Sequence, residues 1–171
     1  MKNDGLKNLG DANHISNKPL WVKKHFCGFT LLELLVVIAI LGTLAGIAIP
    51  AYHSYIEKAR ITKAIAEISI LQKEIAAYEI DKTALPNTLN DIGRGTLLDP
   101  WGNPYQYLNF ADVKGKGKMR KDRLLVPLNS DYDLYSMGKD GTSQSPLTAK
   151  ASHDDIIRAN DGRYIGLASE Y

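Results

Sequence analysis

The residue types that most often carry out chemistry are few and scattered in this chain of 171 residues. The four histidines, His14, His25, His53 and His153, show no metal-site or catalytic spacing, and the single cysteine is Cys27. The sequence contains no nucleophile motif and no phosphate-binding loop. Its net charge of +2 is too small to indicate nucleic-acid binding. The residue types therefore favour a protein that is not an enzyme and binds no nucleic acid.

One carboxylate lies in an unusual place. Glu33 is the only charged residue between Phe29 and Ala51, and this stretch holds thirteen Leu, Ile, Val and Phe residues. On the translocon scale these residues favour insertion of a helix by about 4–8 kcal/mol, whereas a carboxylate costs about 2.5–3.5 kcal/mol at the helix centre. The stretch is also long enough to span a bilayer. It is therefore expected to insert in spite of Glu33.

The residues before this stretch have the composition of a leader. Residues 1–28 are polar, and Lys23 and Lys24 stand shortly before Gly28. The lysines predict a cytoplasmic leader by the positive-inside rule. In an ordinary secretory signal the apolar region precedes the cleavage site, but a cut after Gly28 would leave the apolar helix on the product. Cys27 would be removed with the leader, so the mature chain would hold no disulfide or cysteine metal site.

The segment around Gly28 resembles the processing motif of prepilins, with a glycine, a hydrophobic new N-terminus at Phe29 and a glutamate at the fifth mature position, Glu33. The resemblance implies that a prepilin peptidase cuts between Gly28 and Phe29 and that Phe29 becomes N-methylated. It also implies that Glu33 pairs with the N-terminal amine of a neighbouring subunit. In low dielectric such a pair would set the register, because a misplaced subunit leaves a buried charge uncompensated. Two alternatives stay open: Glu33 reaches the lipid headgroups, or the segment is an ordinary single-pass anchor.

One long helix is expected from about Phe29 to Ile80. Its first part, residues 29–51, is predicted to be the transmembrane segment and filament core. Gly42 and Gly46 form a G-x-x-x-G pair there that permits close contact between helices. In filaments of the family it resembles, the segment between such a glycine and a proline such as Pro50 can lose helicity.

The second part of this helix, residues 52–81, is amphipathic. Its apolar residues recur at spacings of three and four: Ile61, Ala64, Ile65, Ile68, Leu71, Ile75 and Tyr78. This stripe predicts packing of the helix on a globular head formed by residues 82–171.

The head is expected to contain three short strands: Tyr105–Asn109, Leu124–Leu128 and Tyr132–Met137. Between the first two lies a basic glycine-rich stretch, residues 114–121, which predicts a flexible loop. A long helix packed on a small antiparallel three-stranded sheet gives a pilin-like α+β fold of two layers.

Two segments of the head, Leu98–Tyr107 and Asp133–Gly141, resemble the major pseudopilins of type II secretion systems. In that family the C-terminal loop binds calcium. The resemblance implies Ca²⁺ ligands at the backbone carbonyl of Met137, at Asp140 and at Asp155, and oxygen ligands of this kind suit Ca²⁺. Asp154 and Asp161 remain alternatives to Asp155, and an acidic turn without metal is the alternative to the whole site. The leader, the loop from Thr142 to His153 and the tail to Tyr171 are longer than the family pattern.

The resemblance implies a structural function. Such a protein forms a homopolymer, the periplasmic pseudopilus, together with minor pseudopilins, and pushes folded proteins through a secretin in the outer membrane. An inner-membrane assembly platform with its cytoplasmic ATPase would supply the energy. The chain would be a single-pass protein of the inner membrane of a Gram-negative bacterium, with its head in the periplasm. The alternative is a type IV pilin subunit of a surface filament for adhesion, motility or DNA uptake.

Overall fold

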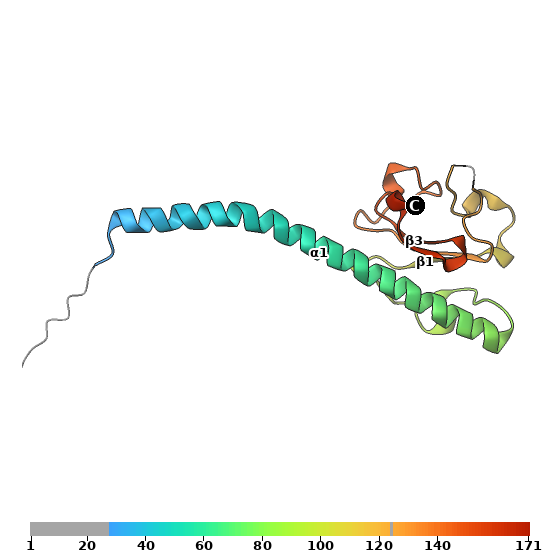
Figure 1. Cartoon of the computed structure of the whole chain (residues 1–171). Helices are drawn as coiled ribbons and strands as arrows, with labels where there is room; N and C mark the ends of the chain where they lie inside the picture. Colours follow the sequence, from blue (N-terminus) through green and yellow to red (C-terminus); the bar gives the residue numbers. More distant parts are fainter. Residues whose placement is uncertain (1–27, 124) are drawn as a thin grey trace, which may run out of the picture. The chain divides into compact units, whose positions relative to one another are not determined.

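The computed structural model describes residues 28–123 and 125–171. The leader before Gly28, with Lys23, Lys24 and Cys27, lies outside the described residues. The described part of the chain divides into two units, with the boundary between Thr43 and Leu44. The helix α1, Leu31–Lys82, belongs in part to each unit, and the sheet belongs to the second (Figure 1).

The expected long helix is confirmed by α1, which includes Pro50 within its span. Its apolar part is long enough and apolar enough to cross a membrane, with a mean hydropathy of 2.5 over its most apolar window. The thirteen Leu, Ile, Val and Phe side chains from Phe29 to Ile49 are all exposed, by 40% to 82%. This part of α1 therefore presents an apolar surface on every side, as a helix surrounded by lipid does.

The head contains a four-stranded antiparallel sheet in the order β1-β2-β3-β4. Its strands are β1 (Gln106–Asn109), β2 (Tyr132–Ser136), β3 (Ile156–Ala159) and β4 (Tyr164–Leu167). The register pairs Gln106 with Tyr135, Ser136 with Ile156, and Ile157 with Gly166. The strands predicted at Tyr105–Asn109 and Tyr132–Met137 are confirmed as β1 and β2.

The strand predicted at Leu124–Leu128 is wrong for the described residues 125–128, which form no strand. Asp122 and Leu125 instead join in a tight turn, with the Leu125 amide donating to the Asp122 carbonyl at 2.6 Å. Pro127 has no amide hydrogen to give to a sheet. The sheet gains β3 and β4 in place of this segment, so the prediction of three strands is corrected to four.

The main core lies between α1 and one face of the sheet. The predicted stripe of α1 is confirmed, because Ala64, Ile68, Leu71 and Ile75 are all buried. They pack with buried residues from the sheet and its loops: Leu89, Tyr105, Tyr132, Leu134 and Ile156.

The opposite face of the sheet is also covered. A second core there contains Leu128, Leu147, Ile157, Ala159 and Ala168, with Tyr135, Tyr164 and Tyr171 packed against it. These residues come from the sheet itself, from the loops and from the C-terminus, so the head has a third layer that the two-layer prediction lacked. Because both faces are covered, every residue of β3 is buried.

Candidate functional site

The residues predicted to be cut and to direct assembly stand at the start of α1. Gly28 and Phe29 precede the helix and are exposed, and a methyl group added at Gly28 would meet no atom within 4 Å. Within residues 28–123 and 125–171, no tertiary contact covers this segment against a protease. The structure describes this segment only in its uncut form, so the cleavage stays a prediction.

Glu33 takes part in a capping box with Thr30. The Glu33 amide donates to Thr30 Oγ1 at 3.1 Å, and the Thr30 amide and hydroxyl each donate to Glu33 Oε2 at 3.4 Å. Such a reciprocal arrangement satisfies amides that the first turn of a helix leaves without partners. The pattern T-x-x-E is a recognisable start signal, and the sequence interpretation missed it. The Glu33 carboxylate thus caps the N-terminus of its own helix, in addition to the pairing between subunits that was predicted for it.

The two head segments that resemble pseudopilins lie next to one another. In the first, Asp99 is buried, and its Oδ1 accepts from the amides of Trp101 at 3.0 Å and Asn103 at 2.8 Å. Asn103 then donates through Nδ2 to the Gly138 carbonyl of the second segment at 3.0 Å. Asp99 Oδ2 accepts from the hydroxyl of Ser136, the last residue of β2, at 2.5 Å. These motifs therefore fix the turn that follows β2, where calcium was predicted.

Asp140 and Asp154 face the same turn. The Asp140 amide donates to Asp154 Oδ2 at 2.9 Å, and Asp140 Oδ1 accepts from the Thr142 amide at 2.8 Å. A Cβ at Gly138, whose φ is +63°, would stand 2.2 Å from the Asp154 carbonyl oxygen. Only glycine allows this close approach. Asp161, the other alternative ligand, accepts instead from the Ser130 amide at 2.7 Å.

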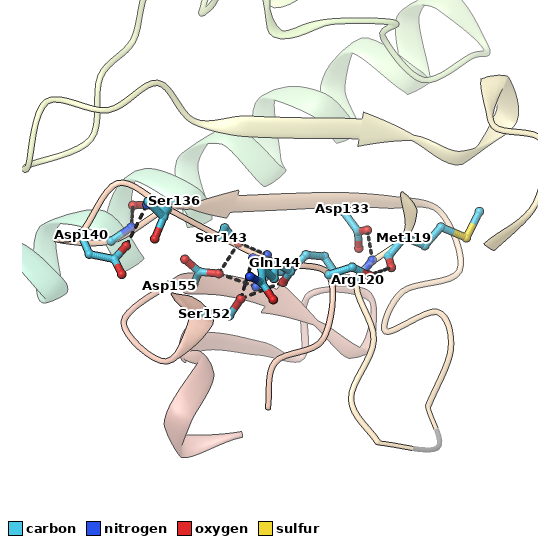
Figure 2. Close-up of polar contacts among 12 residues, drawn as sticks. Met119, Arg120, Asp133, Ser136, Asp140, Ser143, Gln144, Ser152 and Asp155 are labelled. Carbon is cyan, nitrogen blue, oxygen red and sulfur yellow. Dashed lines mark hydrogen bonds and ion pairs between the residues drawn. The ribbon is translucent and has the colours of Figure 1, made fainter. Parts of the chain in front are cut away.

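Asp155 forms an ion pair with Arg120 inside the head. Its side chain is fully buried, and Oδ2 lies 2.5 Å from Arg120 Nη2 and accepts from the Ser143 hydroxyl at 2.6 Å (Figure 2). Burial raises the pKa of the Asp155 carboxyl, while the Ser143 hydrogen bond and the Arg120 charge oppose that rise. Among the described residues no group of three or more His, Cys, Asp or Glu is placed to hold a metal.

The residues present therefore do not fit the predicted ligand set. An ion bound to Asp155 would share one buried carboxylate with a guanidinium, and two cations at such a distance repel each other. The structure instead joins Asp140 with Asp154, and it joins Asp155 with Arg120, which the sequence interpretation had placed in a flexible basic loop. Calcium at Met137, Asp140 and Asp155 stays an expectation that comes from the family resemblance alone.

Comparison with known proteins gives matches over both the helix and the head. The prokaryotic N-terminal methylation motif matches residues 23–49. The chain is 33% identical over 135 residues to the type II secretion system core protein G of Pseudomonas aeruginosa, which covers 67% of this chain and 84% of that protein. It is 32% identical over 139 residues to the core protein G of Dickeya chrysanthemi, covering 79% and 87%. A fimbrial protein of Pseudomonas aeruginosa is 43% identical over 143 residues, covering 79% and 80%. No solved structure matches the chain significantly.

Proposed function

This chain belongs to the core protein G family of type II secretion systems, and from that membership we propose that its mature form is the structural subunit of a periplasmic pseudopilus. The chain is a membrane-anchored, single-pass member of a pilin-like structural family. Its polymer would drive the export of folded proteins across the outer membrane.

The observation that carries the proposal is the exposed apolar part of α1. Side chains such as Leu31 and Ile47 are exposed by 82% and 75%. Contact of so large an apolar surface with water is unfavourable. Lipid covers such a surface in the membrane, and the same surface of other subunits covers it in a filament. One helix can therefore serve first as an anchor and then as the core of a polymer.

The processing steps and partners follow from the same proposal. A prepilin peptidase cuts between Gly28 and Phe29 at the cytoplasmic face of the inner membrane, and Phe29 is then methylated at its amine. Glu33 pairs with the amine of a neighbouring subunit. The further partners are minor pseudopilins, the inner-membrane assembly platform with its ATPase, the secretin and the secreted proteins.

The similarity to fimbrial proteins supports a second candidate, a type IV pilin subunit of a surface filament. The methylation motif does not separate the two, since it describes the N-terminal segment alone. Core protein G relatives of several bacteria match the chain, and the head segments Leu98–Tyr107 and Asp133–Gly141 resemble pseudopilins, which is why the pseudopilus is the first candidate.

A gene deletion in the source bacterium distinguishes the two functions. We expect loss of the chain to trap normally secreted, folded enzymes in the periplasm, as deletion of the secretin gene does in a control strain. Complementation with the intact gene should restore secretion. If secretion continues unchanged while surface filaments, motility or DNA uptake are lost, the chain is a surface pilin.

A further inference from the structure

Arg120 is a buried arginine in a segment that the sequence presents as part of a basic loop. Its side chain is 4% exposed, and the guanidinium carbon lies 4.2 Å from the centre of the Tyr135 ring. Nη2 donates to Asp155 at 2.5 Å, and Nη1 donates to the Ser143 hydroxyl. Figure 2 shows Arg120, Ser143 and Asp155 in one group beside the strands. The positive charge thus meets both a carboxylate and an aromatic face, the partners that a buried guanidinium favours.

The Arg120 segment is also fixed through its backbone. The Arg120 amide donates to Asp133 Oδ2 of β2 at 2.7 Å. The next residue, Lys121, forms two hydrogen bonds with the C-terminal loop, residues 137–155. Its amide donates to the Ser145 carbonyl at 3.1 Å, and its carbonyl accepts from the Leu147 amide at 2.9 Å. The ion pair to Asp155 therefore acts within a segment that already lies against both the sheet and the loop.

Asp155 stands at the point where the C-terminal loop enters β3. Its carbonyl accepts from the Ala168 amide, which follows β4, at 2.9 Å. Ser143, the hydrogen-bond partner shared by Arg120 and Asp155, lies near the beginning of the same loop. The group consequently joins the two ends of the loop, the edge of β3 and the chain after β4.

Two atoms of the pair, Arg120 Nε and Asp155 Oδ1, are buried without a hydrogen-bond partner among the described residues. One is a donor and the other an acceptor, and they belong to the two members of one ion pair. Arginine and carboxylate commonly join two such pairs of atoms in a two-point contact. The free oxygen is thus matched by a donor of this chain, beside a positive charge that disfavours a metal ion.

From this geometry we infer that the Arg120 guanidinium replaces calcium in this chain: it neutralises Asp155 and holds the C-terminal loop, residues 137–155, to the sheet, so that the stability of the head does not depend on divalent cations. The inference departs from the calcium site that the family resemblance implied. It concerns the folded head and holds for either filament function.

Thermal unfolding of the full-length chain in detergent tests this directly. With Trp21→Phe, Trp101 is the only tryptophan, and it reports on the head because its indole donates to Glu57 at 3.0 Å and packs on the main core. We expect the same melting temperature in chelator, in millimolar calcium and in millimolar magnesium. A rise with calcium alone, of the kind that binding to the folded state produces, would overturn the inference without any change at the ion pair.

Variants test the ion pair itself. Arg120→Met leaves the Asp155 charge buried without its cation and should lower the melting temperature by on the order of 10 °C. Adding Asp155→Asn should raise it again, because the uncompensated charge is gone. Arg94→Met is the matched control: it breaks a pair with Glu74 whose side chains are 43% and 31% exposed, and it should cost about 2 °C or less. A double variant that melts no higher than Arg120→Met would show that the two charges do not act as a pair.

Discussion

Glu33 has one role that the structure shows and a second role that is proposed. It caps its own helix through Thr30, and it carries the charge that is proposed to meet the amine of a neighbouring subunit. Capping needs only an acceptor at this position, which glutamine also supplies. The intersubunit pair needs a negative charge.

We expect Glu33→Gln to block filament assembly almost as completely as Glu33→Ala, while both variants are still inserted and cut. The measurement is the yield of filaments from membranes, beside an immunoblot that separates precursor from mature protein. Normal filaments from Glu33→Gln with none from Glu33→Ala would show that capping, not charge, is what assembly requires.

Gly28 differs in that the chain itself has room for a side chain there. Because a Cβ would meet nothing within 4 Å, Gly28→Ala should leave folding unchanged and slow cleavage strongly, through the fit of the peptidase alone. Pulse-chase labelling measures the rate of precursor loss. Gly117→Ala, which also adds a methyl group in open space, is the control and should mature at the normal rate. Equal rates for the two variants would contradict the predicted cut site.

Some of these residue roles could be found in the sequence and others could not. Glu33 and Gly28 belong to a local pattern, and the capping box T-x-x-E was readable there. The Arg120–Asp155 pair joins residues 35 positions apart. Nothing local distinguishes Arg120 from the lysines around it, because its burial depends on how two loops meet. Asp155 therefore looked like a free ligand.

At the scale of elements, the second half of α1 was predictable because its apolar stripe repeats over five turns. Ile68 is fully buried on this stripe, whereas Ile70 is 50% exposed. We expect Ile68→Ala to lower the free energy of unfolding by about 2–5 kcal/mol, through lost burial and the cavity left behind. Ile70→Ala should change it by less than about 1 kcal/mol. Urea unfolding followed by Trp101 fluorescence in the Trp21→Phe background gives both values, and similar losses would contradict the assigned face.

The sheet was only half predictable. β1 and β2 were recognisable because they contain tyrosine, a residue that strands favour, at Tyr107, Tyr132 and Tyr135. β3 was not recognised because it contains a charged residue, Arg158. This arginine is buried with a fork to Asp131, at 2.8 Å for each contact, and its guanidinium carbon lies 4.0 Å from the centre of the Tyr132 ring. β4 is four residues long and contains Gly166, which offers no side chain to a pattern. Residues 124–128 include residue types that strands favour, yet Pro127 and the turn at Asp122 keep the described residues 125–128 out of the sheet.

The tyrosines between α1 and the sheet give a pH test of that packing. Burial raises the pKa of Tyr105 and Tyr107, and it raises the pKa of Tyr132 to about 12. In the unfolded chain these groups ionise near pH 10. Between the two values the unfolded state has lost protons that the folded state keeps, so stability should fall as the pH rises above about 10.

The tyrosinate absorbance of the folded chain at about pH 11 should accordingly lack the contributions of Tyr105, Tyr107 and Tyr132, and these should appear when urea unfolds the chain. Tyr132→Phe keeps the ring and should reduce the delayed signal by one group. Full ionisation of all tyrosines in the folded chain would contradict the buried interface.

At the scale of the whole molecule, the chain joins two units that suit different surroundings. One is an apolar helix with no buried side chain in its most hydrophobic window. The other is a folded head with two hydrophobic cores and its own internal ion pairs. A subunit of this kind can leave the membrane only if other subunits cover its helix, so cutting, insertion and polymerisation belong to one sequence of events.

Mass spectrometry of subunits from purified filaments tests this sequence most directly. Cells that overproduce the chain together with an active prepilin peptidase should yield filaments whose subunit begins at Phe29 and carries one added methyl group at its amine. Cells with an inactive peptidase should contain only the precursor and no filaments. Filaments built from subunits that still begin at Met1, or a precursor that stays uncut beside an active peptidase, would contradict the proposed function at its centre.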